Sequence, residues 1–340
     1  MIGRGVLLVC SVLLAGCAPT STQQPGASDH IIAMPSPPRA FDHMVVDEQS
    51  GVLYLADRSN GAVDVFALDS GSFVASIGGF HSGGPNGLEL VSDRGELWAA
   101  DADSTVRIID ISSRAIVATV ATNGHGRTDD LAYDPKDKVI VVGNDSESTP
   151  FVTFISTADR RVVGRLEFPG ALGMEEVHWR AERDLFYQAV PATNANGGGE
   201  IDVVDPVAMK VTSAFKLSDC GPHGIALGPG DDVLVGCGAS HALIVDGQSG
   251  ATLATFPQIG GVDVVWYDGP SERYLLAGSA TGNGTPVRGS AIGVIDAKTR
   301  TWTLDIATGS PTHSVAADAR TGRIYVPISG VGVRVIEPPR

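Results

Sequence analysis

The sequence predicts an all-β fold in which seven four-stranded blades close into a β-propeller. A short phrase, a polar residue followed after one position by an apolar strand, returns seven times along the 340 residues, at intervals of 40 to 50 residues. A period of this length with four short strands in each unit is typical of propeller blades. The composition agrees, because 42 glycines and runs of Val, Ile and Thr broken by Asp, Asn, Gly and Pro are typical of short strands joined by tight turns.

The first six units each contain four expected strands, and the seventh contains three. In the first unit the strands read DHMVV, GVLYLA, AVDVFAL and FVASI, and the same order returns in the units that begin NGLEL, DDLAY, EEVHW, HGIAL and DVVWY. The last unit, HSVAA, GRIYVP and GVRVIE, lacks its outer strand. Residues 31–34 have the composition to supply it, and a closed ring hides strand edges. We therefore expect one propeller over residues 31–337, with an N-terminal strand completing the last blade.

The N-terminal segment is expected to be an export signal rather than part of the propeller. Arg4 precedes an apolar run of about ten residues, which is too short to span a bilayer. The run ends in Leu-Ala-Gly-Cys17, which resembles the lipobox of bacterial lipoproteins. This resemblance implies a signal peptide over residues 1–16, lipidation of Cys17, and a location at the cell envelope, on its periplasmic face or at the cell surface. Residues 17–30 lack apolar periodicity and are expected to form a flexible tether.

Charge and cysteine usage narrow the possible partners. The net charge of −15 is opposite to what binding to phosphate requires, so a nucleic-acid partner is excluded. The only expected membrane contact is through the N-terminal lipid, and we expect a monomer. Beyond the signal and the expected lipidated Cys17, two cysteines remain: Cys220 precedes the expected strand that begins at His223, and Cys237 ends the next strand. In an oxidising compartment they are expected to form a disulfide, with a pair of metal thiolates beside His223 as the alternative.

Several phrases resemble a known repeat family. PHGIAL, DPKDKVIVV, DGQSGATLATF and TGRIYVP are similar to the YVTN-type seven-bladed β-propeller repeats of exported bacterial proteins. The tetrapeptide itself is degenerate here, since YLAD, WAAD, VVGN and YVPI stand at its position. The resemblance implies a propeller fold but little about activity, because this fold supports binding proteins and enzymes alike.

The polar residue of each phrase is a potential ligand, and all seven are expected at one mouth of the central channel. These ring residues are Asp42, Asn86, Asp129, Glu175, His223, Asp263 and His313. Carboxylate and amide oxygens suit hard cations such as Ca²⁺, whereas zinc or manganese would favour imidazole nitrogen with carboxylate. We predict one divalent ion (Ca²⁺, Mn²⁺ or Zn²⁺), with His223, Asp263 and His313 as ligands on three neighbouring blades in the case of a transition metal. A water-filled ring and a directly bound organic ligand remain alternatives.

Three functions follow from this ring. The first is a lipid-anchored binding protein that holds a metal ion, a small ligand or an envelope protein at the channel mouth, through Asp42, Asn86, Asp129, Glu175 and Arg127. The second is a metal-dependent lactonase or hydrolase, similar in logic to the gluconolactonase and regucalcin propellers, with Asp129, Glu175 or Asp263 moving the proton. The third is an interaction scaffold with an idle channel.

Overall fold

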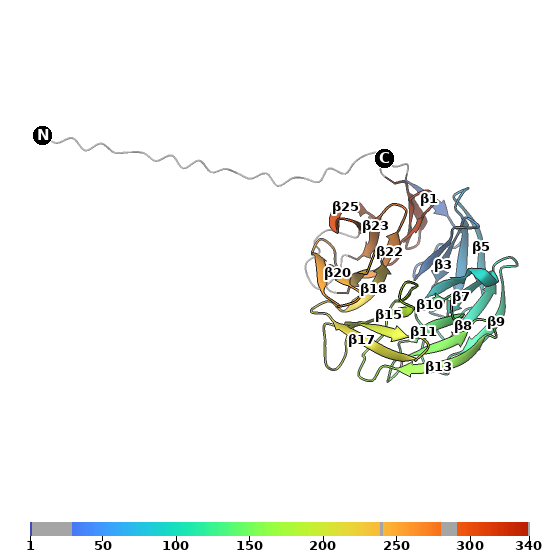
Figure 1. Ribbon diagram of the computed structural model, residues 1–340. Coiled ribbons are helices and arrows are strands. Elements are labelled where there is room, and N and C mark those ends of the chain that lie inside the picture. The colour runs from blue at the N-terminus through green and yellow to red at the C-terminus, as the bar shows by residue number, and fades with distance from the viewer. Residues whose placement is uncertain (2–28, 239–240, 280–290, 339–340) are drawn as a thin grey trace.

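The computed structural model describes Met1 and residues 29–238, 241–279 and 291–338, and these residues form seven four-stranded antiparallel sheets. The expected signal peptide, Cys17 and almost all of the expected tether lie outside the described residues. The innermost strands of the seven sheets are β2 (Met44–Asp47), β6 (Leu88–Val91), β10 (Leu131–Asp134), β14 (Val177–Arg180), β18 (Pro222–Leu227), β22 (Val262–Asp268) and β26 (Ala316–Asp318). Each of them contacts the innermost strands of two neighbouring blades, so they close a ring around the channel (Figure 1).

In six blades the other strands follow outward in chain order, and in the last blade the first strand of the chain supplies the outer position. The second strands are β3 (Val52–Asp57), β7 (Glu96–Ala100), β11 (Val139–Asn144), β15 (Leu185–Val190), β19 (Asp232–Cys237), β23 (Arg273–Gly278) and β27 (Arg323–Ile328). The third strands are β4 (Ala62–Ala67), β8 (Thr105–Asp110), β12 (Phe151–Ser156), β16 (Glu200–Asp205), β20 (Ala242–Asp246), β24 (Ala291–Asp296) and β28 (Gly332–Ile336). The outer strands are β5 (Ser72–Gly78), β9 (Ala115–Ala121), β13 (Arg161–Glu167), β17 (Lys210–Lys216), β21 (Thr252–Phe256), β25 (Thr301–Ala307) and β1 (His30–Ala33).

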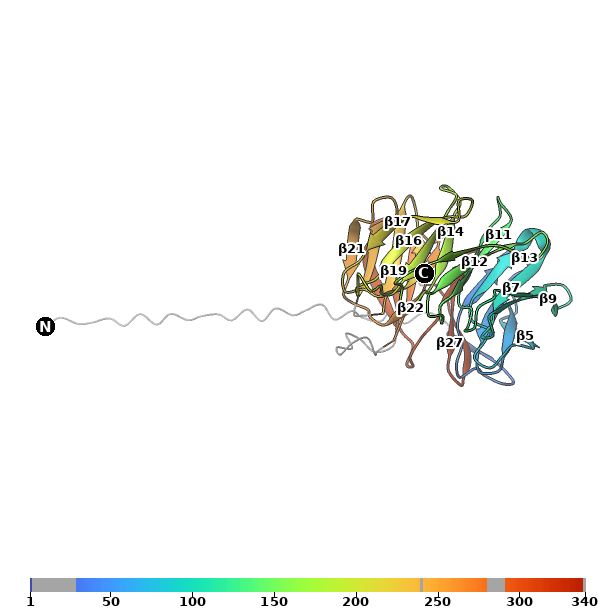
Figure 2. The same cartoon turned by 90° about the horizontal axis from the view of Figure 1, so that it is seen from below.

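The hydrophobic core is divided between the blades. Seven clusters of buried side chains occur, one at each interface between neighbouring blades. The second strands are buried along almost their whole length, whereas the outer strands alternate with the period of two expected of a sheet with one solvated face. Figure 2 shows the blades from below. The predicted all-β fold with seven blades is confirmed.

Helical structure is nearly absent from the described residues. One 3₁₀ turn, η1 (Ser92–Arg94), follows β6. Within the described ranges there is no helix with the length and apolar character needed to cross a membrane.

Acidic residues at the ends of third strands stabilise the turns that follow. The Oδ1 atom of each accepts a hydrogen bond of 2.7–2.9 Å from the backbone N–H three residues later. The four residues are Asp110, Asp205, Asp246 and Asp296. Side-chain bonds of this kind favour a turn over continued strand. Part of the negative charge of the chain therefore serves the repeat itself.

The N-terminal strand completes the last blade, as predicted. β1 pairs antiparallel with β28, with Ile32 opposite Val333, and Figure 1 shows the blue β1 beside the red C-terminal strands. The observed strand begins at His30, one residue before the predicted segment. Since the two ends of the described chain share one sheet, the ring is closed without a covalent bond.

Replacing Ile32 by alanine is expected to test this closure. Ile32 is 2% exposed in the interface between the last and first blades, so its loss should lower the free energy of unfolding by about 2–4 kcal/mol. Ile31 on the same strand is 42% exposed, and Ile31→Ala should change stability by less than about 0.5 kcal/mol. Urea unfolding of both variants measures the difference, and equal effects would contradict an ordered closing strand.

Candidate functional site at the channel mouth

The seven ring residues occupy equivalent places at the start of the innermost strands. His223 and Asp263 are the second residues of β18 and β22, and the others lie just before the strand of their blade. A repeated backbone bond sets this position, because the ring residue's N–H donates to a carbonyl near the end of the second strand. The bond is 2.9–3.0 Å long at Asp42, Asn86, Asp129 and Glu175. The repeated bond therefore brings these four positions to one face, and contacts of His223, Asp263 and His313 with one another and with Asp42 and Glu175 place them beside these four.

Asp263 lies between two imidazoles from the neighbouring blades. Its Oδ1 is 2.9 Å from Nδ1 of His223, and its Oδ2 is 2.7 Å from Nε2 of His313. The three side chains are 26–41% exposed, so they are accessible from the mouth. The structure thus brings together the three residues that the sequence suggested for a transition metal, with Asp263 in the middle.

A further carboxylate stands beyond each imidazole. The Oδ1 atom of Asp42 is 3.4 Å from Nε2 of His313, and Oε1 of Glu175 is 3.8 Å from Nδ1 of His223. Two sets of three ligand atoms result, each set lying within 4.8 Å, and both sets contain Asp263. We name them the first group (Asp42, Asp263, His313) and the second group (Glu175, His223, Asp263). Imidazole nitrogen with carboxylate oxygen is a donor set that suits zinc or manganese.

The carboxylates and imidazoles of the two groups strongly shift one another's pKa values. Although burial opposes it, hydrogen bonds from His223 and His313 hold the pKa of Asp263 well below its usual range. Burial likewise opposes a charged imidazole, but Asp263 and Asp42 raise the pKa of His313 to about 11. Without a cation, His313 is therefore protonated near neutral pH and acts as the positive partner of the two carboxylates.

The pKa values of the carboxyl groups on blades three and four are shifted in the opposite direction. Burial raises the pKa of Asp129 to about 8, and burial with repulsion from Asp129 and Asp263 raises that of Glu175 well above its usual value. Arg127 is 2.9 Å from Asp145 through Nε and 3.3 Å from Asp129 through a terminal nitrogen. Its guanidinium is thus already held by two carboxylates of its own blade.

Asn86 is fully buried, and its amide is only half satisfied. Its Nδ2 donates to the carbonyl of Thr128 over 2.6 Å, whereas its Oδ1 has no hydrogen-bond partner in the described part of the chain. An unpaired buried acceptor is costly in free energy, so a hydrogen-bond donor bound at the mouth near this oxygen would be stabilised.

A second set of charged residues, His43, Asp130 and Glu176, directly follows three of the ring residues in the sequence. Asp130 accepts a 3.0 Å bond from the N–H of Val177, and Glu176 accepts a 2.6 Å bond from that of Ile225. Each acid therefore joins its own blade to the innermost strand of the next. His43 lies 3.6 Å from Asp130 and 3.9 Å from Glu176, and despite burial these negative charges, together with Asp42, raise its pKa to about 9. The doubled acids in DDLAY and EEVHW are the sequence signal for these contacts, although sequence reasoning assigned them no such role.

The raised pKa of Glu89 in β6 leads to a prediction of how the stability of the fold depends on pH. Burial and the negative charge of Asp130 raise its pKa to about 8, above the ordinary 4.5. Between these values the folded chain retains a proton that the unfolded chain loses, so the free energy of unfolding falls as pH rises from about 4.5 to 8. Glu89→Gln mimics the protonated acid. We expect the variant to match the wild type near pH 5 and to exceed it at pH 8.5, by on the order of 1–4 kcal/mol.

Chemical denaturation of chelator-treated protein at the two pH values measures this effect. The exposed Glu182 provides the control, because Glu182→Gln should leave the pH dependence unchanged. A Glu89→Gln variant with the wild-type pH dependence would show that Glu89 does not hold a proton in the folded chain.

The remaining candidates lie outside the two groups. His81 is 2.8 Å from Asp103, and Arg107 is 2.6 Å from the nearby Asp101. The guanidinium of Arg107 therefore already balances negative charge in this cluster. Cys220 and Cys237 form a disulfide, which leaves no thiolate for a metal. His178 lies 3.6 Å from Glu176 and belongs to neither group.

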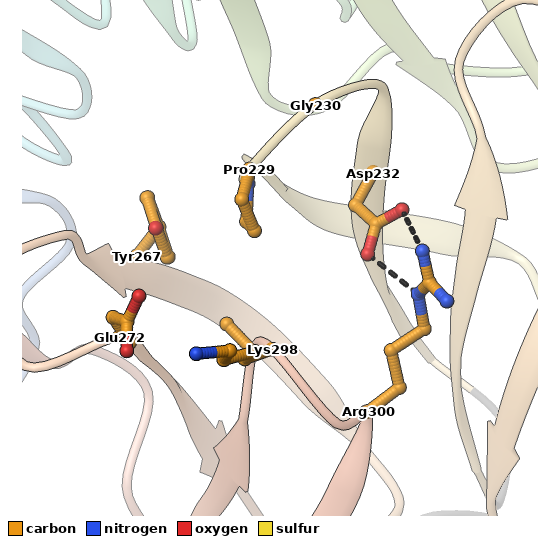
Figure 3. A pocket seen from close by; sticks show the side chains of 8 residues that line it. Pro229, Gly230, Asp232, Tyr267, Glu272, Lys298 and Arg300 are labelled. Atoms are coloured by element: carbon orange, nitrogen blue, oxygen red, sulfur yellow. Dashed lines mark hydrogen bonds and ion pairs between the residues drawn. The ribbon is translucent and has the colours of Figure 1, made fainter.

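A pocket of about 290 Å³ lies at the other end of the blades, and no ring residue lines it. It is formed by turns of blades five and six, as Figure 3 shows, with Tyr267, Glu272 and Lys298 around it. Arg300 in its wall forms two hydrogen bonds of 2.7 and 2.9 Å with Asp232. This guanidinium is therefore committed to joining two blades, and sequence reasoning gave no indication of the pocket.

Comparison with known proteins supports the fold alone. No family model and no curated protein matches the chain. Among solved structures the chain is similar to one in "Crystal Structure of Mitotic Checkpoint Complex", with a TM-score of 0.75 and 14% identity over 98% of this chain and 100% of that chain. At this identity the similarity shows the fold alone. Because 1814 solved chains match the structure, the fold does not select one function.

Proposed function

We propose that this β-propeller is a binding protein of the cell envelope that binds divalent metal cations at its channel mouth. The observation that carries the proposal is the placement of Asp263 between His223 and His313, with one more carboxylate beyond each imidazole. With so many carboxylates gathered at one mouth, a cation would relieve their mutual repulsion. A cation bound there would keep coordination positions open toward solvent, through which a small ligand or a segment of an envelope protein could be held.

Zinc and manganese fit these donors better than calcium. Each group supplies one imidazole nitrogen and two carboxylates, whereas Ca²⁺ takes six to eight oxygen ligands. Elemental analysis of protein purified without chelator is expected to find bound metal. Addition of Mn²⁺ or Zn²⁺ to stripped protein should raise its unfolding temperature by several degrees, since a hundredfold excess over Kd stabilises by about 2.7 kcal/mol. Protein that contains no metal and shows no thermal shift would contradict the proposal.

The proposed location depends on the N-terminal sequence. The lipobox-like Leu-Ala-Gly-Cys17 and the phrases similar to YVTN-type repeats support an exported, lipid-anchored member of that repeat family. Mass spectrometry of the N-terminal peptide from a membrane fraction should find an acylated Cys17. An unmodified Cys17 in the secreted or cell-associated chain would contradict the anchor.

Hydrolysis of a lactone or ester is the second candidate function. It is favoured by Asp129, whose pKa of about 8 lets the carboxyl give or take a proton near neutral pH. A bound divalent ion would supply Lewis-acid polarisation of a carbonyl. A panel of lactones, tested with added Mn²⁺ or Zn²⁺, separates the two candidate functions. Activity that Asp129→Asn abolishes while metal remains bound would support the enzyme. No turnover of any lactone would support a binding function without catalysis.

A further inference from the structure

The two oxygens of Asp263 point to different imidazoles. We propose that the channel mouth holds two divalent cations bridged by the carboxylate of Asp263. The inference rests on the proposed cation binding and adds its stoichiometry and geometry. One cation lies in the first group, between Asp42, His313 and Oδ2 of Asp263, and the other in the second group, between Glu175, His223 and Oδ1 of Asp263.

The distances favour two separate positions over one shared position. His313 approaches Oδ2 of Asp263 at 2.7 Å and Asp42 at 3.4 Å, whereas His223 approaches Oδ1 at 2.9 Å and Glu175 at 3.8 Å. Among the described residues, no set of three potential ligand atoms within 4.8 Å of one another contains both imidazoles. Each imidazole thus has its own carboxylate and its own oxygen of Asp263. A carboxylate shared through both oxygens is compatible with the spacing of about 3.5–4 Å found between the ions of two-metal sites.

The charges are compatible with this arrangement. Coordination requires neutral imidazoles and ionised carboxylates. The three liganding carboxylates then carry three negative charges, and two divalent cations nearly balance them. A single cation would neutralise the outer carboxylate of one group only, although Asp42 is also 3.2 Å from the guanidinium of Arg58.

Neighbouring residues orient His223 toward this position. A side chain at Gly238 would come within 2.8 Å of Nε2 of His223, so the absence of a Cβ there gives the imidazole room while Nδ1 faces Asp263. Gly238 follows Cys237, and the Cys220–Cys237 disulfide ties this segment to the residues just before β18, the strand that carries His223. Such support is typical of metal ligands, which need a fixed ring orientation.

The unpaired Oδ1 of Asn86 is an independent sign of a ligand. Asn86 is fully buried at an equivalent ring position, and this oxygen lacks a partner in the described residues. Its Nδ2 is fixed by Thr128, so the acceptor cannot be satisfied there by rotating the amide without losing that bond. Water coordinated to a cation in the mouth is a donor of the kind that this oxygen lacks.

Manganese titration of the stripped full chain tests the pair. We expect two Mn²⁺ per chain by elemental analysis, and an electron paramagnetic resonance spectrum of two coupled ions at full loading. His313→Ala and His223→Ala should each reduce the stoichiometry to one and leave the uncoupled six-line signal of a single Mn²⁺. His178→Ala is the matched control and should retain two coupled ions, because His178 belongs to neither group.

The outcomes separate this inference from the proposed function. One ion per wild-type chain, abolished by either histidine substitution, would overturn the pair and leave cation binding intact. No bound ion in the wild type would overturn both. If a histidine variant fails to fold, the stoichiometry and the spectrum of the wild type decide, and His313→Gln and His223→Gln repeat the test with side chains closer in size.

Discussion

Replacing Asp263 by alanine is expected to remove cation binding from the channel mouth altogether. Asp263 is the one residue that both groups share, with its two oxygens 2.9 and 2.7 Å from His223 and His313. Each remaining pair, one imidazole and one carboxylate, is too few ligands for a stable site. We expect affinity for Mn²⁺ or Zn²⁺ to fall by a factor of at least about 100, since even loss of a ligand's supporting partner costs 10–100-fold.

Calorimetric titration of the stripped proteins measures this loss, and two substitutions calibrate it. Glu175→Ala should weaken only the second group, so that one ion still binds. Asn86→Ala changes a ring residue outside both groups and is expected to have a smaller effect. Near wild-type affinity in Asp263→Ala would show that the mouth does not bind cations through this carboxylate.

The sequence predicted the ring because the repeat fixes backbone positions. Seven equivalent residues precede or begin seven equivalent strands, and the bond from the ring N–H to the second strand recurs from blade to blade. The spacing of the phrases therefore places Asp42 and His313 on one face, although 271 residues separate them. Closure by β1 was predictable for a similar reason, since the last unit was one strand short.

The contacts within the ring were not predictable from spacing. The sequence suggested one ion between His223, Asp263 and His313, but side-chain rotamers decide which oxygen of Asp263 faces which imidazole. Arg127 was expected to help hold a ligand at the mouth, and its guanidinium lies against Asp145 and Asp129 of its own blade. The first outcome depends on distances between blades and the second on side-chain packing within one blade, and the spacing of the phrases contains neither.

The close approach of neighbouring innermost strands leads to the second large effect, the substitution Gly224→Ala. Gly224 follows His223 in β18, and a Cβ there would lie 2.3 Å from the carbonyl oxygen of Asp263 and 3.0 Å from the nitrogen of Val265. Backbone atoms cannot yield as a side chain can, so β18 and β22 must separate. We expect the free energy of unfolding to fall by about 3 kcal/mol, the upper end for overpacked interiors.

The same displacement should weaken cation binding, because His223 and Asp263 stand on the two strands that move apart. Denaturant unfolding and a Mn²⁺ titration of one Gly224→Ala preparation measure both effects. Gly78→Ala is the matched control, since a Cβ at Gly78 meets no atom within 4 Å, and it should leave both quantities near the wild-type values. A Gly224→Ala variant as stable as the wild type would show that the blades are not packed this closely. A variant that is destabilised yet binds Mn²⁺ with unchanged affinity would show that the mouth does not depend on the contact between β18 and β22.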